Sequence, residues 1–138
     1  LQGHAVQQVA CGGFHTAAVT DAGSLWTWGG GEHGQLGLGS KVNQYTPVPV
    51  TALDCSVVVQ VACGWSHSVA LTDEGAVFVF GNGDHGKLGL GDTAKVLTPR
   101  RVEALSGQTA ISVASYNEHT AVVVDRKGVA SAPMCSTY

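Results

Sequence analysis

The stretch at residues 28–39, WGGGEHGQLGLG, has the glycine spacing of a phosphate-binding loop. Residues 29–34 fit G-x-G-x-x-G, in which glycines let the backbone approach a pyrophosphate at the N-terminus of a helix. That chemistry requires a helix directly after the last glycine. Residues 35–39, QLGLG, instead carry glycine at every second position, which disfavours a helix. The stretch therefore predicts a tight loop with no bound nucleotide or other cofactor.

Histidines recur at fixed positions, as they do in metal sites and around catalytic bases. His15, His67 and His119 share one position of a repeat, and His33 and His85 share another. A zinc site needs four converging ligands with matching spacing, and the sequence shows no such set. Serine and aspartate accompany the histidines in every copy, which favours a scaffold role over a unique catalytic triad. We expect each histidine to hydrogen-bond backbone within its own repeat unit, and we predict neither a metal site nor enzymatic activity.

Cysteines could form disulfides or hold metal, but their placement favours buried thiols. The four cysteines are Cys11, Cys55, Cys63 and Cys135. Two of them occupy the same position of a repeated phrase, V-A-C-G, and no C-x-x-C pair occurs. Free cysteine is among the most buried residue types, so we expect buried, reduced thiols and an intracellular protein, cytoplasmic or nuclear.

These residues recur because the chain contains an internal repeat of 52 residues. Residues 9–53 and 61–105 align without a gap, and about half of the aligned positions are identical. A third, shorter copy begins at Leu105, gains one residue and lacks the glycine-rich loop. The repeat units are 1–52, 53–104 and a truncated 105–138.

Each full unit contains about four short segments that are typical of β-strands. In the first unit they are residues 6–11, 16–20, 25–28 and 47–50. The aromatic residues of the third segment and its copy are expected in the core: Trp26, Trp28, Phe78 and Phe80. Recurring aspartates are expected to cap the turns: Asp21, Asp73 and Asp125. Units of this length with four antiparallel strands predict an all-β fold of β-propeller blades.

Composition excludes several classes of protein. Of 138 residues, 44% are hydrophobic and only 12% are charged, which excludes a disordered tail. The net charge is −3 and basic residues form no run, so no nucleic-acid footprint is present. No apolar stretch is long enough to span a membrane.

The repeated phrases resemble the regulator of chromosome condensation repeat. Both full units carry V-A-C-G-x-x-H-[ST]-x-A-[VL]-T-D-x-G, then G-x-x-H-G-x-L-G-L-G, then T-P-x-x-V. The resemblance implies a β-propeller, usually of seven blades, of which this chain would supply about two and a half. We therefore expect an incomplete ring, either a piece of a longer propeller or a chain that forms homo-oligomers through its open blade edges.

The resemblance also implies where a partner binds. In the family's exchange factor, partner-contacting residues lie in loops on one face, just before the repeat histidine. The matching residues in this sequence are Phe14, Trp65, Ser66, Asn117 and Glu118. Ultraviolet receptors of the family carry tryptophans in the position of Trp65, but with arginine where Ser66 stands here.

Two functions follow from this resemblance and from Phe14 and Trp65, whose positions vary between copies within an otherwise fixed phrase. The first is a non-catalytic protein–protein interaction module that binds a protein through loops on one face. The alternative is a guanine-nucleotide exchange factor for a small, Ran-like GTPase. Exchange needs a surface that distorts the nucleotide site rather than catalytic side chains, so the lack of a chemical motif leaves both open.

Overall fold

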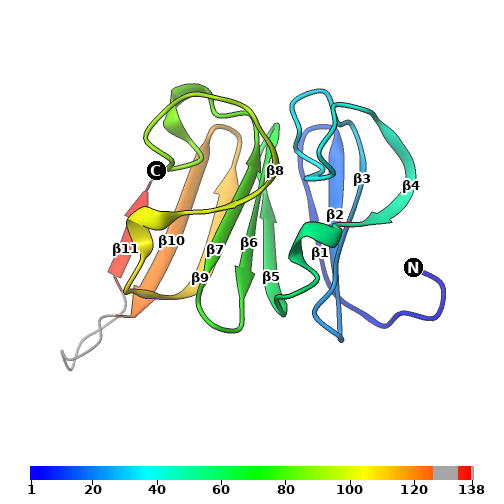
Figure 1. The fold of residues 1–138 in the computed structure, drawn as a ribbon, viewed down its shortest axis with the longest axis horizontal. Coiled ribbons are helices and arrows are strands. Elements are labelled where there is room, and N and C mark those ends of the chain that lie inside the picture. Colours follow the sequence, from blue (N-terminus) through cyan, green and yellow to red (C-terminus); the bar gives the residue numbers. More distant parts are fainter. Residues whose placement is uncertain (126–133, 138) are drawn as a thin grey trace.

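The computed structural model describes residues 1–125 and 134–137 and shows three antiparallel sheets side by side (Figure 1). The first sheet contains β1 (Val6–Cys11), β2 (His15–Thr20), β3 (Leu25–Gly29) and β4 (Gln44–Pro49). The second contains β5 (Val58–Cys63), β6 (His67–Thr72), β7 (Val77–Gly81) and β8 (Val96–Arg101). The third contains β9 (Thr109–Tyr116), β10 (His119–Asp125) and β11 (Met134–Thr137). Strand order in each sheet follows the chain, so each strand pairs with the strand that follows it in sequence.

Short 3-10 turns are the helical elements in the described part of the chain. They are η1 (Thr51–Leu53), η2 (Asp84–Gly86) and η3 (Glu103–Leu105). None of the helices in residues 1–125 and 134–137 is long and apolar enough to cross a membrane.

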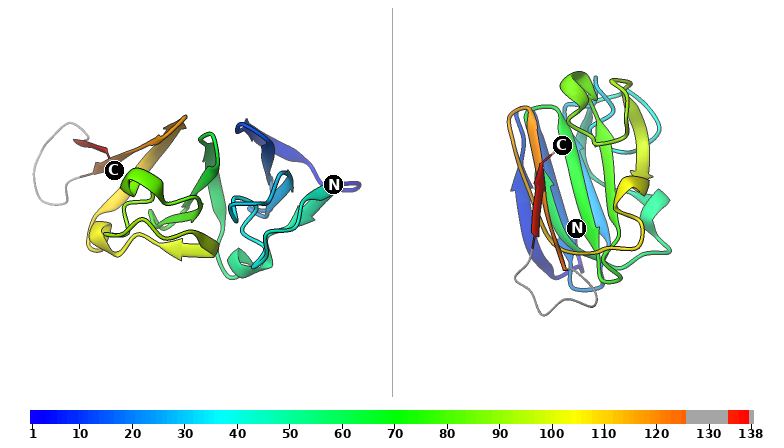
Figure 2. Two further views of the ribbon diagram at one scale, coloured as in Figure 1. Left: turned by 90° about the horizontal axis from the view of Figure 1, so that it is seen from above. Right: turned by 90° about the vertical axis from the view of Figure 1, so that its left-hand side faces the viewer.

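The three sheets pack as propeller blades, which confirms the predicted fold class. Contacts join β1 to β5 and β5 to β9, so the first strands of neighbouring sheets lie together. Seen from above, the sheets fan out side by side (Figure 2). All six residues of β6 are buried, because this strand is covered by a sheet on each side. Strands that are buried on both faces read as continuous apolar or small-residue runs, as SVAL does here.

The core fills the spaces between the sheets. Its largest fully buried side chains include Phe80, Leu25, Leu36, Val69 and Val79. The core prediction is confirmed for Phe80, whereas Trp26, Trp28 and Phe78 are only half-buried. Phe80 lies on the same face of β7 as Phe78, but the glycine-rich loop of the first unit packs against its ring at Gly37, which accounts for its complete burial.

Glutamines tie neighbouring sheets together. The Gln8 amide both donates to the Val61 carbonyl (3.0 Å) and accepts from the Val61 N–H (2.9 Å). One repeat later, Gln60 accepts from the Val113 N–H at 2.9 Å. Each amide thus satisfies backbone groups at the edge of the next sheet, which would otherwise be left unpaired.

The prediction that the cysteines are buried is correct for Cys63 and wrong for Cys11 and Cys55, which are exposed free thiols. Cys63 lies against the neighbouring sheet, where its thiol donates to the Ala10 carbonyl at 3.8 Å. Burial raises the pKa of Cys63 to about 12, so it is unreactive. Cys11 holds the same repeat position on β1, but no preceding sheet covers it in the described residues. The side chain of Cys135 lies outside those described.

The turn between the second and third strands is capped by threonine rather than by the predicted aspartate. The Thr20 hydroxyl accepts from the Ser24 N–H, and the Thr72 hydroxyl accepts from the Ala76 N–H, both at 3.1 Å. Asp21 is exposed, and its backbone N–H donates to the Ala5 carbonyl. Each threonine lies one residue before the recurring aspartate and is buried, and its hydroxyl is within hydrogen-bonding distance of the N–H four residues later.

Candidate functional site

The tips between the first and second strands of the three sheets lie in a row on one face. They comprise residues 12–14, 64–66 and 117–118. The Gly13 N–H donates to the Trp65 carbonyl (2.9 Å), and the Trp65 N–H donates to the Asn117 carbonyl (2.8 Å). These backbone hydrogen bonds join each tip to the next, so the row is held at a fixed spacing rather than as three separate loops.

A glycine in the first tip makes room for an aromatic residue of the second. A Cβ on Gly13 would lie 2.7 Å from the Trp65 carbonyl oxygen and 2.8 Å from its indole Cδ2. Real Cβ contacts are longer than this, so the close approach requires glycine. The indole also contacts Phe14, with ring centroids 5.5 Å apart and an interplanar angle of 78°, the edge-to-face geometry that aromatic pairs favour.

Both rings are exposed although they pack on each other. Phe14 is 70% exposed and Trp65 is 51% exposed. Large aromatic side chains in solvent are uncommon on a surface that binds nothing, and aromatic residues dominate the energy of protein interfaces.

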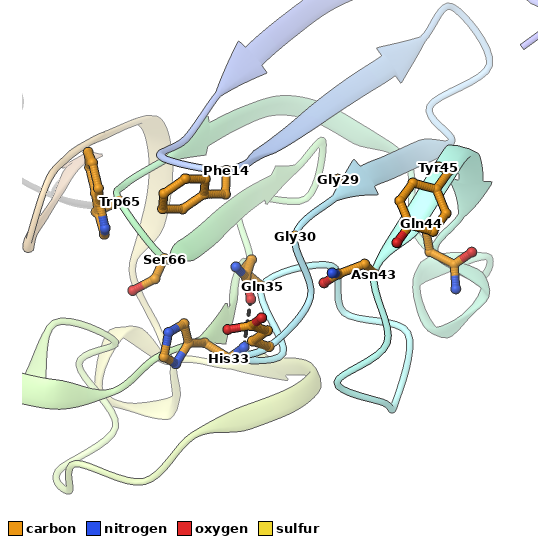
Figure 3. A pocket seen from close by; sticks show the side chains of 11 residues that line it. Phe14, Gly29, Gly30, His33, Gln35, Asn43, Gln44, Tyr45, Trp65 and Ser66 are labelled. Atoms are coloured by element: carbon orange, nitrogen blue, oxygen red, sulfur yellow. Dashed lines mark hydrogen bonds between the residues drawn. The ribbon is translucent and has the colours of Figure 1, made fainter.

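A pocket of about 460 Å³ opens beside these rings, between the first two blades (Figure 3). Its lining residues are Phe14, Gly29, Gly30, Glu32, His33, Gln35, Asn43, Gln44, Tyr45, Trp65 and Ser66. Phe14 and Trp65 stand on one side, and Gln44 and Tyr45 stand on the other. The structure therefore brings three of the five predicted partner-binding residues, Phe14, Trp65 and Ser66, into one pocket.

The glycine-rich loop forms the floor of this pocket, and it contains no helix, as predicted. Gly29 has φ +100°, a conformation that favours glycine, and the Gly31 N–H donates to the Asn43 side-chain oxygen at 2.9 Å. The His33 N–H donates to the side-chain oxygen of Gln35 at 2.9 Å. These two loop amides are therefore engaged by side chains of the chain itself.

The pocket carries one ionised group. Glu32 is exposed, and the lining contains no lysine or arginine. Glu32 also has no ion-pair partner within the described residues. The carboxylate therefore leaves the pocket with an unbalanced negative charge.

The third tip is chemically different, because its acid is already paired. Glu118 forms a hydrogen-bonded ion pair with Lys87, whose side chain is completely buried. The hydrogen bond from Lys87 lowers the pKa of Glu118 below its usual value. The neighbouring Asn117 adopts φ +44°, which asparagine tolerates in a tight turn. These two predicted site residues do not line the pocket described above.

The histidine prediction is wrong for His15 and His67, which bind the neighbouring blade instead of backbone in their own. His15 Nε2 lies 2.8 Å from the Ser68 hydroxyl, and His67 Nε2 lies 2.8 Å from the Thr120 hydroxyl. Both imidazoles are buried in the seams between sheets, and the Nδ1 atom of each has no hydrogen-bond partner among the described residues. Burial lowers the pKa of each to about 4, so both are neutral at pH 7. They are structural groups rather than catalytic bases.

Sequence reasoning missed the side of the pocket that comes from the fourth strand and the loop. Tyr45 is 91% exposed, and it stands where the second unit has Leu97. That difference within an otherwise repeated segment is the same signal that singled out Trp65. No group of three or more His, Cys, Asp or Glu in residues 1–125 and 134–137 is placed to hold a metal ion.

Comparison with known protein families gives matches over most of the chain. A family model described as "Regulator of chromosome condensation (RCC1) repeat" matches residues 22–71 and 74–123. A second model with the same description matches residues 6–35 and 58–87.

Individual relatives are longer than this chain. The ultraviolet-B receptor UVR8 of Arabidopsis thaliana is 41% identical over 91% of this chain, which spans 29% of that receptor. The crystal structure of human WBSCR16 superposes with a TM-score of 0.81 at 26% identity, over 96% of this chain and 38% of that one. Prp20p of Saccharomyces cerevisiae superposes with a TM-score of 0.76 at 20% identity, over 85% of this chain and 30% of that one.

Proposed function

Because the chain belongs to the regulator of chromosome condensation (RCC1) repeat family, we propose that it is a non-catalytic interaction module that binds a protein through its row of blade tips. The family supplies a propeller scaffold, and the tips supply the specificity. The binding residues in this proposal are Phe14, Trp65 and Ser66 at the pocket, with Asn117 and Glu118 extending the surface along the third tip.

One observation carries the proposal: an exposed aromatic pair on a rigid base borders a pocket. Phe14 and Trp65 are exposed, yet the tips beneath them are joined by backbone hydrogen bonds. A preorganised aromatic anchor loses little conformational entropy on binding, which is why such residues become interface hot spots.

The test is to identify a partner by affinity capture with the 138-residue chain and then to titrate that partner in purified form. Trp65→Ala should weaken its affinity by about tenfold or more, as loss of a hot-spot tryptophan does. Glu74→Ala changes an exposed residue at the opposite end of the second sheet and should leave affinity unchanged. Equal affinity of the purified partner for Trp65→Ala and the original chain would contradict the proposal.

Guanine-nucleotide exchange is the second candidate. It is favoured by the shared fold with Prp20p, whose structure was described with its binding to Gsp1p and to histones. The acid of the third tip, however, is already neutralised by Lys87, which leaves less negative charge for a partner there. Release of a fluorescent GDP from a Ran-like GTPase in the presence of the chain measures this activity directly. We expect no acceleration.

We further propose that additional blades cover the two outer sheets, either from a longer chain or from a second copy. Val9 is 60% exposed, whereas Val61 and Val113 at the same repeat position are buried against a preceding sheet. At the other end His119 is exposed, whereas His15 and His67 are buried. Light scattering on a sizing column distinguishes the sources, since a homo-oligomer has the mass of a whole number of chains.

An intracellular location remains part of this proposal.

A further inference from the structure

We infer that the pocket between the first two blades receives an arginine side chain from the partner protein. This inference rests on the proposed function and specifies the chemistry of its partner. The arginine would pair with Glu32 and lie against the aromatic rings of Trp65 and Phe14.

The charge in the pocket selects a cation. Glu32 is the ionised group among the lining residues, and it has no ion-pair partner within the described chain. The amide side chains of Asn43 and Gln44 also line the pocket and are uncharged, and the Asn43 Oδ1 accepts from the Gly31 N–H. An anionic ligand would meet the carboxylate without any lysine or arginine to offset it, so the lining favours a cationic group.

The two aromatic rings favour a planar cation whose faces are apolar. Phe14 and Trp65 meet edge to face and remain exposed, so they offer π surface to a ligand in the pocket. A guanidinium stacks on such a surface while its edge donates in parallel to a carboxylate. A lysine ammonium makes the first contact as a point charge and lacks the second geometry, so arginine fits this lining better.

The next seam of the same molecule shows a cation between a loop and a tip. Lys87 occupies the repeat position of Gln35, and Glu118 occupies the repeat position of Ser66. In that seam the loop lysine reaches the tip glutamate and is completely buried. In the first seam the same two positions carry neutral side chains, so the chain itself supplies no cation there. Glu32 lies at the repeat position of Asp84 and has no cation of the described chain paired with it, so the partner's arginine would supply its counter-ion.

The experiment uses two peptides that differ at one side chain, which is cationic in one and neutral in the other. One is acetyl-Gly-Gly-Arg-Gly-Gly-amide, and the other has citrulline, a neutral isostere, in place of arginine. Each is titrated into the ¹⁵N-labelled 138-residue chain while amide and indole resonances are followed by NMR. We expect the arginine peptide to bind at least about fivefold more tightly than the citrulline peptide and to shift the indole N–H resonance of Trp65.

Two matched variants place the binding site. Glu32→Gln should reduce the affinity for the arginine peptide by about fivefold and remove its preference over citrulline. Glu74→Gln makes the same chemical change at an exposed residue on the opposite face and should leave both affinities unchanged. Both substitutions are at exposed positions, and the unperturbed remainder of each NMR spectrum shows that the variant is folded.

The inference is overturned if the two peptides bind equally, if neither shifts the resonances of the pocket, or if Glu32→Gln binds arginine as tightly as the original chain. Its failure is distinguishable from failure of the proposed function. A purified partner that loses affinity with Trp65→Ala but not with Glu32→Gln would support the interaction surface and exclude the arginine. A partner unaffected by both substitutions would remove the surface as well.

Discussion

Acidification should destabilise the seams between the blades, because the buried histidines take up a proton less readily in the folded chain than in the unfolded chain. Burial lowers the pKa of His15 and His67 to about 4 in the folded chain, from the ordinary value of 6.5 for histidine. Between these values the unfolded chain binds more protons than the folded chain. The free energy of unfolding must therefore fall as the pH drops from about 6.5 towards about 4.

The size of the effect follows from the two pKa values. One pKa unit corresponds to about 1.4 kcal/mol, so each histidine should cost about 2 kcal/mol of stability at pH 5 and about 3 kcal/mol below pH 4. Together the two should remove about 4 kcal/mol between about pH 7.5 and pH 5. Domains of this size are typically stable by about 5 to 15 kcal/mol, so the loss is large enough to measure. Glu118 adds little between about pH 7.5 and pH 5, because its carboxyl is mostly ionised there in the unfolded chain as well as in the folded chain, where the hydrogen bond from Lys87 lowers its pKa.

Urea unfolding followed by circular dichroism at both pH values measures this loss. His15→Gln and His67→Gln should each reduce the pH-dependent part by about 2 kcal/mol, since glutamine can still hydrogen-bond but does not titrate. His4→Gln is the control, because His4 is exposed and should keep the full pH dependence. The reasoning is refuted if the two buried-site variants retain the pH dependence of the original chain.

Three substitutions test other contacts. Gly13→Ala should displace the Trp65 indole and cost about 1 to 3 kcal/mol, visible as a change in tryptophan fluorescence and a lower denaturation midpoint; an unchanged emission spectrum would contradict the close approach. Phe80→Ala, at a fully buried ring, should cost about 3 to 5 kcal/mol in urea unfolding, and a cost below about 1 kcal/mol would refute its core role. Glu118→Gln should cost about 3 to 5 kcal/mol in urea unfolding, because it leaves Lys87 buried and unpaired. The double variant Lys87→Gln with Glu118→Ser carries the residues found in the first seam and should recover most of that loss. A double variant as unstable as Glu118→Gln would refute this.

Much of the fold was predictable because the two full repeat units carry the same pattern of strand and turn residues. Two aligned copies identify the turns and strands with more certainty than either copy alone. The fourth strand is the main difference in bounds: β4 begins at Gln44, earlier than the predicted residue 47, because Gln44 pairs with Gly29 of β3. The residue at which β4 begins to pair with β3 depends on the path of the glycine-rich loop between them. The residue types in that loop do not specify its path. The assignment of repeat units to 1–52, 53–104 and 105–138 stays a prediction.

The seams between the blades were not predictable from the same pattern. Their hydrogen bonds join residues 53 positions apart, as between His15 and Ser68 or Gln8 and Val61. The 52-residue repeat identifies equivalent residues, whereas these bonded residues lie one position out of phase, and nothing in the repeat shows that they touch. Contact depends on the angle at which two sheets pack, and that angle is set by the whole core.

The candidate site was predicted in part for a similar reason. Phe14 and Trp65 stood out as variable residues within a repeated phrase, Ser66 followed from the family resemblance, and all three line one pocket. Glu32 and Tyr45 join them only because the glycine-rich loop folds back beside the tips. Positive φ angles at several glycines direct that path, and sequence indicates that they are permitted without showing where they lead.

Hydroxyl-radical footprinting of the chain with and without its purified partner tests the central claim most directly. The oxidation rate of exposed aromatic side chains reports their burial in the complex. We predict that Phe14, Trp65 and Tyr45 become protected, while Cys55, exposed on the connection at the opposite end of the blades, is oxidised at the same rate. Protection of Cys55 with no change at the three aromatic residues would contradict the claim that the blade tips form the binding surface.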